Sequence, residues 1–282
     1  MRLKFYLYTI AISCIILSCE DDKKNEKLQK NPKQKIQLTA KDILGNPNYL
    51  AISYGGYRKS TRGIQPTVAE IKEDMKILHA MKIKILRTYN VQLAQAETIL
   101  KAIHELKSEN PSFEMYVMLG AWIDCKNAWT NHPVNHQIES DQNESEIARA
   151  VSLANKYPSI VKIIAVGNEA MVKWATNYYV QPSVILKWVS YLQDLKKQKK
   201  LPKNLWITSS DNFASWGGGS DEYHTEDLNK LIEEVDYISM HTYPMHDTHY
   251  NPVFWYTKEE KPNIEKVNNI MLRARDYAVS QY

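Results

Sequence analysis

The sequence of 282 residues predicts an α/β fold, a (β/α)8 TIM barrel of which only about six of the eight βα units are present in this chain. From about Tyr49 onward, short apolar runs alternate with amphipathic stretches, as expected for parallel strands joined by right-handed crossovers. Gly55 and Gly56 end the first run but precede a loop instead of a helix, which argues against a dinucleotide-binding doubly wound sheet. Polar and aromatic residues follow nearly every strand, which is typical of a barrel whose rim forms one site.

The N-terminus has the features of a targeting segment. Positive charges precede an apolar stretch, residues 5–17, that is too short to cross a bilayer as a stable anchor. Ser18 and Cys19 then resemble the lipobox of bacterial lipoproteins, whereas a conventional signal peptide with an incidental cysteine is the alternative. We expect residues 1–18 to be a lipoprotein signal peptide and Cys19 to be lipidated. The protein is then anchored in the cell envelope, at the outer membrane, on its periplasmic or its surface face.

Composition limits the remaining possibilities. Residues 19–40 are charged and lack an apolar period, so we expect a disordered tether, followed by the barrel domain over residues 41–282. A formal charge of +4 is small for this length and does not suggest nucleic acid. After removal of the signal peptide and lipidation of Cys19, only Cys125 remains as a thiol, and we interpret it as inert because no histidine partner is evident. Tyrosine (18) and tryptophan (7) outnumber phenylalanine (4), which suits a surface that stacks on sugar rings.

Six apolar runs predict the strands, in the order 50–56, 83–90, 113–122, 160–166, 205–209 and 237–240. The fourth is the most informative, because the apolar residues of IIAVGNEA (163–170) continue without a turn to Gly167, Asn168 and Glu169. A continuous apolar run fits a strand buried on both faces. Glu169 then lies at the carboxyl end of the sheet, where barrels build their active sites. The alternative is that Glu169 caps the next helix.

Helical periodicity appears between the strands, and the predicted helices are 67–81, 94–106, 144–157, 184–200, 226–234 and, after the last strand, 263–279. Thr67 and Glu70 have the spacing of a capping box at the first of these helices. The lysine-rich end of the fourth helix is interpreted as a solvated C-terminus that complements the helix dipole.

An ordered set of residues at the strand ends resembles glycoside hydrolase family 17. The residues that carry this resemblance are Tyr54-Gly55, Arg87-Thr88-Tyr89-Asn90, Gly120, Val166-Gly167-Asn168-Glu169 and Tyr243-Pro244. The resemblance extends over most of the chain after about Lys41. It implies a (β/α)8 glycosidase that acts on β-1,3-glucan, as an endo-glucanase or a glucanosyltransferase, and that needs no metal or organic cofactor.

The resemblance also implies roles for individual residues. Glu169 is implied as the catalytic acid/base and Asn168 as the ligand of a sugar 2-hydroxyl. The further substrate-binding residues that we expect are Tyr54, Arg87, Tyr89, Trp122, His241 and Tyr243. The sequence departs from the family pattern at the residues before Tyr243-Pro244. His241-Thr242 stand there, where the family usually has asparagine, and this affects the sugar contacts expected on that side of the cleft.

A physical argument supports Glu169 independently of the resemblance. Cleavage with retention of configuration needs one carboxylic acid to protonate the leaving oxygen and a second carboxylate about 5–5.5 Å away to attack the anomeric carbon. Burial behind apolar neighbours disfavours the charged form of a glutamate, so we predict that the pKa of Glu169 is raised, as an acid catalyst requires.

Other polar and aromatic residues have a functional and a structural interpretation. The spacing of His241, His246 and His249 matches no zinc signature, so we expect no metal site there. Tyr54 and Tyr89 either orient the sugar or are buried tyrosines with satisfied hydroxyls. The tryptophans expected on rim loops are Trp122, Trp129, Trp216 and Trp255, and those expected in helices or the core are Trp174, Trp188 and Trp206. Residues 216–220 are expected to form a flexible edge of the cleft.

A complete barrel needs two more units than the six counted here. In family 17 the nucleophilic glutamate ends the seventh strand, and no glutamate of this chain fits that position. We therefore expect the sequence to be incomplete at its C-terminus. The predicted activity is that of a retaining glycosidase on laminarin-like β-1,3-glucan polysaccharide or oligosaccharide. The alternatives are a β-1,3-glucanosyltransferase and a cell-surface glucan-binding lipoprotein without turnover.

Overall fold

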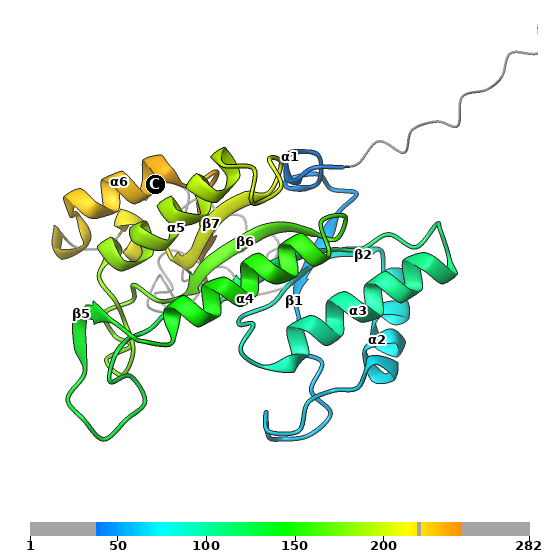
Figure 1. Ribbon diagram of the computed structural model, residues 1–282, viewed down its shortest axis with the longest axis horizontal. Helices are drawn as coiled ribbons and strands as arrows, with labels where there is room; N and C mark the ends of the chain where they lie inside the picture. Colours follow the sequence, from blue (N-terminus) through cyan, green and yellow to red (C-terminus); the bar gives the residue numbers. More distant parts are fainter. Residues whose placement is uncertain (1–37, 219–220, 244–282) are drawn as a thin grey trace, which may run out of the picture. The chain divides into compact units, whose positions relative to one another are not determined.

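The computed structural model describes residues 38–218 and 221–243, and within them six parallel strands form one sheet (Figure 1). The strands are β1 (Leu50–Ser53), β2 (Ile83–Arg87), β3 (Tyr116–Ala121), β6 (Val161–Asn168), β7 (Trp206–Asn212) and β8 (Ser239–His241). They lie side by side in chain order, and every neighbouring pair is parallel. Successive βα units of a barrel have this arrangement. The α/β prediction is confirmed, and the count of eight strands stays a prediction.

Five helices connect the strands close to the predicted positions: α2 (Val68–Ala80), α3 (Ala94–Glu109), α4 (Asn143–Lys156), α5 (Pro182–Lys197) and α6 (Glu226–Glu234). Their apolar faces and the sheet share one large buried cluster. The capping box is present, since Glu70 N donates to Thr67 Oγ1 (3.2 Å) and Thr67 N donates to Glu70 Oε2 (2.8 Å). The predicted helix over 263–279 lies outside the described residues.

Strand β6 is buried on both faces, as its continuous apolar run predicted. Ile164 and Val166 belong to the cluster that the helices cover. Ile163 and Ala165 pack on the other face of the sheet, against Met118 of β3. Side chains that alternate between two buried faces explain why residues 163–167 contain no polar side chain.

A short helix that the sequence did not reveal, α1 (Ala40–Ile43), packs on that second face of the sheet. Ala40 contacts the cluster around Met118, and Ile43 packs with Ile85 and Tyr116. Thr39 is the N-cap residue of this helix. The prediction of a disordered tether up to residue 40 is therefore wrong at its end, because one helical turn is too short to produce a recognisable period. The remaining tether and the signal peptide lie outside the described residues.

The second unpredicted feature is a two-stranded hairpin, β4 (Cys125–Lys126) and β5 (Asn135–Glu139), inserted between β3 and α4. It is visible on the left of Figure 1, apart from the main sheet. Cys125 is a buried free cysteine, and burial raises the pKa of its thiol, which keeps the sulfur protonated and is consistent with an inert residue. None of the helices within residues 38–218 and 221–243 has the length and apolarity needed to cross a bilayer.

Gly120 allows the carboxyl ends of β2 and β3 to approach closely. A Cβ atom at Gly120 would lie 2.4 Å from the carbonyl oxygen of Thr88, well inside van der Waals contact. In addition, Gly120 N donates to Thr88 Oγ1 (3.1 Å). This glycine is therefore needed for the backbone geometry directly after Arg87.

Candidate active site

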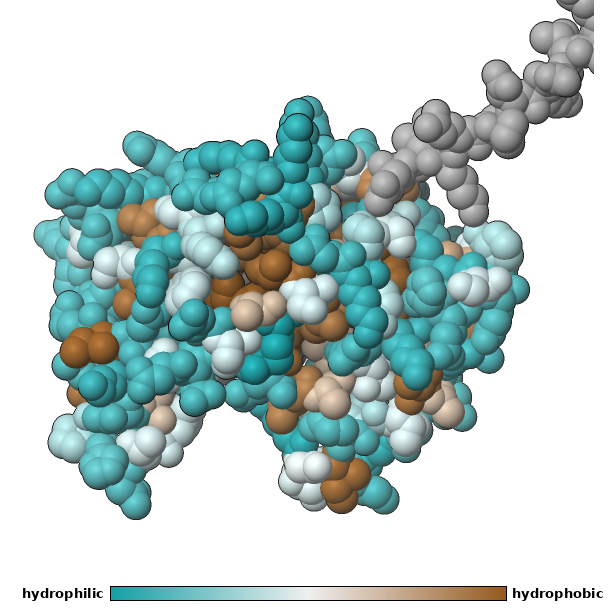
Figure 2. Space-filling model, viewed as in Figure 1, coloured by the Kyte–Doolittle hydropathy of each residue, from teal (hydrophilic) through white to brown (hydrophobic). Residues whose placement is uncertain are grey.

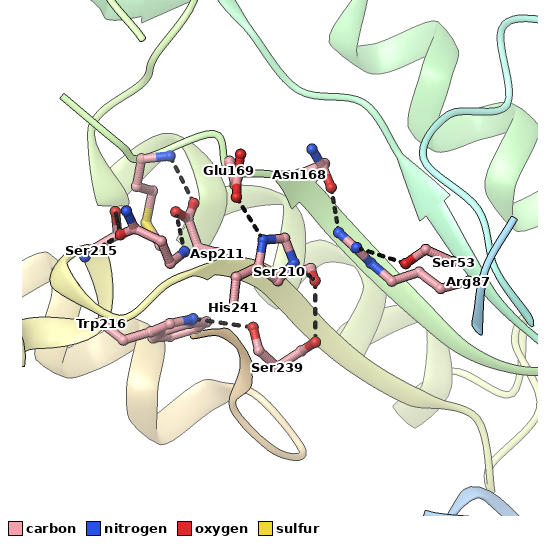
Figure 3. A network of polar contacts seen from close by, with 12 residues as sticks. Ser53, Arg87, Asn168, Glu169, Ser210, Asp211, Ser215, Trp216, Ser239 and His241 are labelled. Carbon is pink, nitrogen blue, oxygen red and sulfur yellow. Dashed lines mark hydrogen bonds and ion pairs between the residues drawn. The ribbon is translucent and has the colours of Figure 1, made fainter. Parts of the chain in front are cut away.

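Polar side chains from β2, β6, β7 and β8 meet at the carboxyl end of the sheet (Figure 3). Arg87 ends β2, Asn168 ends β6 with Glu169 directly after it, and His241 ends β8. Their positions in the chain are far apart, but parallel strands bring their carboxyl ends to one edge. The structure thus brings together four of the residues expected at the site.

The backbone turns sharply at Glu169. Gly167 (φ 82°) and Glu169 (φ 47°) both lie in the left-handed region, which is unfavourable for a glutamate. Glu169 N donates to the carbonyl oxygen of Ser210 on β7 (2.8 Å), which holds this conformation in place. The interpretation of Glu169 as a helix cap is wrong, because the next helix begins at Pro182 and its N-cap residue is Gln181.

Glu169 is bound to a histidine. His241 Nδ1 lies 2.9 Å from Glu169 Oε1, and His241 Nε2 lies 2.9 Å from Ser210 Oγ. Because an ionised carboxylate only accepts hydrogen bonds, Nδ1 carries a proton and donates to Glu169, while Nε2 forms a hydrogen bond with Ser210 Oγ. Ser210 Oγ also contacts Ser239 Oγ (3.1 Å). This chain of contacts fixes the orientation of the imidazole toward Glu169, as Figure 3 shows.

The electrostatics at Glu169 differ from the prediction. The hydrogen bond from His241 holds the pKa of Glu169 below its ordinary value, and the charges of His241 and Arg87 act in the same direction. Burial opposes this effect but is smaller, since the side chain keeps 21% of its surface exposed. The prediction that the pKa of Glu169 is raised is therefore wrong. It was based on burial alone and did not include the hydrogen bond from His241.

Arg87 positions the neighbouring asparagine. Its Nη2 donates to Asn168 Oδ1, its Nη1 lies 3.4 Å from Ser53 Oγ, and its guanidinium lies 5.0 Å from the centre of the Tyr89 ring. The guanidinium is thus held on three sides. Since Oδ1 of Asn168 faces Arg87, the amide nitrogen points away from it (Figure 3) and is oriented to donate to a bound hydroxyl.

Asp211 on β7 supports the loop that carries Glu169, a role that the sequence did not reveal. Its side chain is fully buried. Met171 N donates to Oδ2 and Asn212 N donates to Oδ1, both at 2.8 Å. Burial raises the pKa of this carboxyl to about 6. A polar residue inside an otherwise buried strand was the available signal, but its partner at Met171 is evident only in three dimensions.

The remaining expected site residues are distributed differently. Tyr54 donates its hydroxyl to Asp74 Oδ2 on α2 (2.5 Å), so the structural interpretation holds for its hydroxyl. Tyr89 packs on Arg87, and Tyr243 is exposed. Trp122 lies with another group of aromatic side chains, near Tyr178. Cys19, His246, His249 and Trp255 lie outside the described residues.

Two tryptophans are not where they were expected. Trp216, predicted on a flexible rim loop, is buried and donates from Nε1 to the carbonyl oxygen of Ser239 (3.3 Å). Trp174, predicted in a helix or the core, is 65% exposed on the loop after β6. Within the described ranges, no three His, Cys, Asp or Glu side chains form a group that could hold a metal ion.

The arrangement has a definite chemical capability. Glu169 is a partly exposed carboxyl group that can release a proton to a bound molecule and take one back. His241 stabilises its ionised form, and the Asn168 amide beside it can bind a hydroxyl group. This combination suits acid/base chemistry on a polyhydroxylated substrate.

Comparisons with known proteins point to the same chemistry. Residues 51–271 match the family model of the BtgE/BtgC glycoside hydrolase domain. The chain is similar to an endo-laminarinase from Formosa Hel1_33_131, with 67% identity and a TM-score of 0.82, over 86% of this chain and 63% of that one. The chain therefore spans less than two thirds of the length of that enzyme.

A second solved structure is more distant. It is CJP38, a β-1,3-glucanase and allergen of Cryptomeria japonica pollen, with 13% identity and a TM-score of 0.47, over 82% of this chain and 71% of that one. Among curated proteins, none is significantly similar to the chain.

Proposed function

Because this chain belongs to the family of the BtgE/BtgC glycoside hydrolase domain, we propose that it cleaves β-1,3-glucan of the laminarin type with retention of configuration. The observation that carries this proposal is the position of Glu169 at the end of β6, bound to His241 and adjacent to Asn168. The 67% identity with an endo-laminarinase supports the choice of substrate. The residues at the strand ends further support assignment to glycoside hydrolase family 17.

In this mechanism Glu169 acts twice. Its protonated carboxyl first gives its proton to the glycosidic oxygen as the bond to the anomeric carbon breaks. The ionised carboxylate then takes a proton from the water that releases the sugar. The hydrogen bond from His241 stabilises the ionised form, which is the form needed in the second step.

Retention also requires a nucleophilic carboxylate about 5–5.5 Å from Glu169. Asp211 is unsuited to this role, since it is fully buried and both of its oxygens accept from backbone amides. The proposal therefore needs a carboxylate other than Asp211 as the nucleophile. Asn168, oriented by Arg87, is proposed to bind the sugar 2-hydroxyl.

The test uses the full-length protein and its Glu169→Gln variant, which keeps the size of the side chain and removes the titrating proton. We expect the wild-type protein to release reducing ends from laminarin and the variant to lose at least about two orders of magnitude in rate. Binding of laminarin in an affinity gel should be retained. Equal rates for the two proteins would refute the role of Glu169, and products longer than the substrate would indicate transfer to a sugar acceptor instead of hydrolysis.

We also propose that the protein is a lipoprotein anchored in the cell envelope through Cys19. The support is the order of a charged segment, an apolar stretch over residues 5–17 and Ser18-Cys19. One acyl chain binds membranes only weakly, whereas the several chains of a lipoprotein bind firmly. Mass spectrometry of the mature N-terminus tests this, and an unmodified first residue other than Cys19 would contradict it.

A further inference from the structure

A hollow of about 460 Å³ lies beside the β4–β5 hairpin, and Glu169 and His241 are not among the residues that line it. Figure 2 shows the surface hollowed between two projections, which correspond in Figure 1 to the loop after β1 and the loop of this hairpin. The lining comes from five connecting segments and the first turn of α4. Arg62, Gln92 and Gln142 contribute polar groups, and Trp122 and Trp129 contribute rings. Its volume is within the range of pockets that bind small organic ligands.

One wall of the hollow is aromatic. Trp129 stacks on Tyr178 with ring centres 5.0 Å apart and an interplanar angle of 22°, and Trp122 packs against the same tyrosine at 5.4 Å. Trp129 nevertheless keeps 61% of its surface exposed. A fixed but exposed indole surface beside a hollow is suited to stacking on a flat apolar face.

The backbone at Trp129 is also unusual. Its φ of 60° lies in the left-handed region, which bulky side chains rarely adopt. Such conformations persist only where surrounding contacts hold them, and they occur often at ligand-binding sites. The hairpin thus holds Trp129 against Tyr178 at a conformational cost that simple exposure of a tryptophan does not explain.

Buried polar contacts fix the floor of the hollow. Glu146 accepts hydrogen bonds from Val91 N (2.6 Å) and Trp122 N (3.0 Å) and pairs with Arg149. Trp122 Nε1 donates to Asp124 Oδ2 (3.2 Å), which sets the orientation of the indole. The rings are therefore arranged before any ligand binds, which lowers the entropic cost of binding.

Tyr178 connects the aromatic wall with the candidate active site. Its pKa is raised to about 12, first by burial and then by the negative charges of Glu169 and Asp211. The charge of Glu169 therefore acts on Tyr178, whose ring also stacks on Trp129 and packs at a tilt against Trp122. Tyr178 thus belongs both to the aromatic wall of the hollow and to the electrostatic surroundings of Glu169.

We propose that this hollow is an additional sugar-binding subsite, which takes a glucosyl ring of the glucan chain at a distance from the bond that is cleaved. The ring stacks on Trp129 and Trp122, and its hydroxyls bind to Arg62, Gln92 and Gln142. The equatorial hydroxyls of a β-glucosyl ring leave its two faces apolar, so that stacking and edge-on hydrogen bonding occur together. The identity of the sugar rests on the proposed function.

The test measures binding by the full-length protein carrying Glu169→Gln, so that the ligand is not consumed. Laminarihexaose and laminaribiose are titrated calorimetrically into this protein and into the same protein with Trp129→Ala or Trp174→Ala added. Trp174 is the matched control, because it is equally exposed but does not line the hollow. Thermal unfolding of all three proteins checks that they are folded.

We expect Trp129→Ala to weaken binding of the hexaose about three- to tenfold, the range of typical aromatic contacts. The affinity of the Trp129→Ala protein for the biose should be unchanged. The Trp174→Ala protein should bind both sugars as its parent does. Equal affinity of the Trp129→Ala protein and its parent for the hexaose, or no binding of the hexaose at all, overturns the subsite. If wild-type protein hydrolyses laminarin and Trp129 has no effect, only the subsite fails. If Trp129→Ala weakens binding of the hexaose but the wild-type protein does not hydrolyse laminarin, only the proposed function fails.

Discussion

The imidazole of His241 lies 2.9 Å from the carboxylate of Glu169, across 72 positions of the chain. An asparagine at position 241 would offer a neutral NH₂ group as donor, whereas a histidine can also carry a positive charge. The residue type at position 241 thus affects the protonation of Glu169 directly.

His241→Asn should move the pH dependence of catalysis. His241 lowers the pKa of Glu169, so its removal raises that pKa. Donation by Glu169 requires the protonated form, and activity is lost as pH rises through the pKa. The high-pH limb of the kcat/KM profile on laminarin should therefore move to higher pH. The exposed His224→Asn variant should leave the limb in place, and an unmoved limb in His241→Asn would show that Glu169 is not the group that titrates.

Arg87→Lys should reduce activity without unfolding the protein. An ammonium group cannot bind Asn168 and Ser53 together and stack on Tyr89 as the planar guanidinium does. We expect kcat/KM to fall by about ten- to a hundredfold, the effect of losing a hydrogen bond to a charged group. Arg58→Lys, which alters an ion pair with Asp74 outside the site, should leave kcat/KM unchanged. If kcat/KM of the Arg87→Lys protein is unchanged, catalysis does not depend on the orientation that Arg87 gives to Asn168.

Asp211→Asn should destabilise the protein and lower activity. Two backbone amides donate to the two carboxylate oxygens, and an asparagine presents an NH₂ group to one of them. A buried unsatisfied group costs about 1–3 kcal/mol, which thermal unfolding detects. The exposed Asp194→Asn variant is the control for loss of charge. Unchanged stability would show that the amide of Met171 does not depend on Asp211.

The difference in stability between the wild-type protein and Asp211→Asn should also depend on pH. The carboxyl of Asp211 has a pKa of about 6 in the folded state, raised from 3.8. The folded state therefore binds more protons between these values, and the stability contributed by the protonated group is lost as pH rises from about 4 to about 6. The difference in unfolding free energy between wild type and Asp211→Asn should change over this interval and be constant above it.

Lys162→Met should stabilise the protein at neutral pH. Lys162 is 4% exposed, and burial lowers the pKa of its ammonium group from 10.5 to about 8. That difference corresponds to about 3 kcal/mol of destabilisation below pH 8, which the nearby Tyr116 ring partly offsets. Since the unfolded state binds more protons between about 8 and 10.5, the cost disappears as pH rises through this range.

Unfolding free energies at pH 7 and pH 10 measure this effect. The advantage of Lys162→Met should be large at pH 7 and small at pH 10. The exposed neighbour Lys203, changed to methionine, should show no such pH dependence. A methionine variant that is less stable at pH 7 would mean that the contacts of the ammonium group with the Tyr116 ring and the carbonyl oxygen of Pro158 (3.4 Å) outweigh the cost of its burial.

The sequence predicted the features that depend on local pattern. Each of the six strands was visible as an apolar run, and because parallel strands end at one edge, the meeting of Arg87, Asn168, Glu169 and His241 followed from their positions. The hairpin β4–β5 was missed because much of β5 is exposed and its residues are mostly polar. Helix α1 was missed because one turn has no period.

The features that depend on contacts between distant residues were not predictable. The lowered pKa of Glu169 comes from a histidine on another strand. The burial of Trp216 depends on the carbonyl oxygen of Ser239, and the exposure of Trp174 depends on the course of a loop without regular structure. Residue type and spacing indicate where a strand ends but not which partner its last side chain meets.

The chain-order sheet also determines when the site is assembled during synthesis on the ribosome. Each new strand can pair with the strand made immediately before it, so Ser53 and Arg87 are available to receive Asn168 as soon as β6 emerges. His241 follows Glu169 by 72 positions. At translation rates of about 5–20 residues per second, the carboxylate waits about 4 to 14 seconds for its imidazole. Until then Glu169 lacks the hydrogen bond that is the main cause of its lowered pKa, and the pair of Glu169 and His241 forms only after β8 has been made.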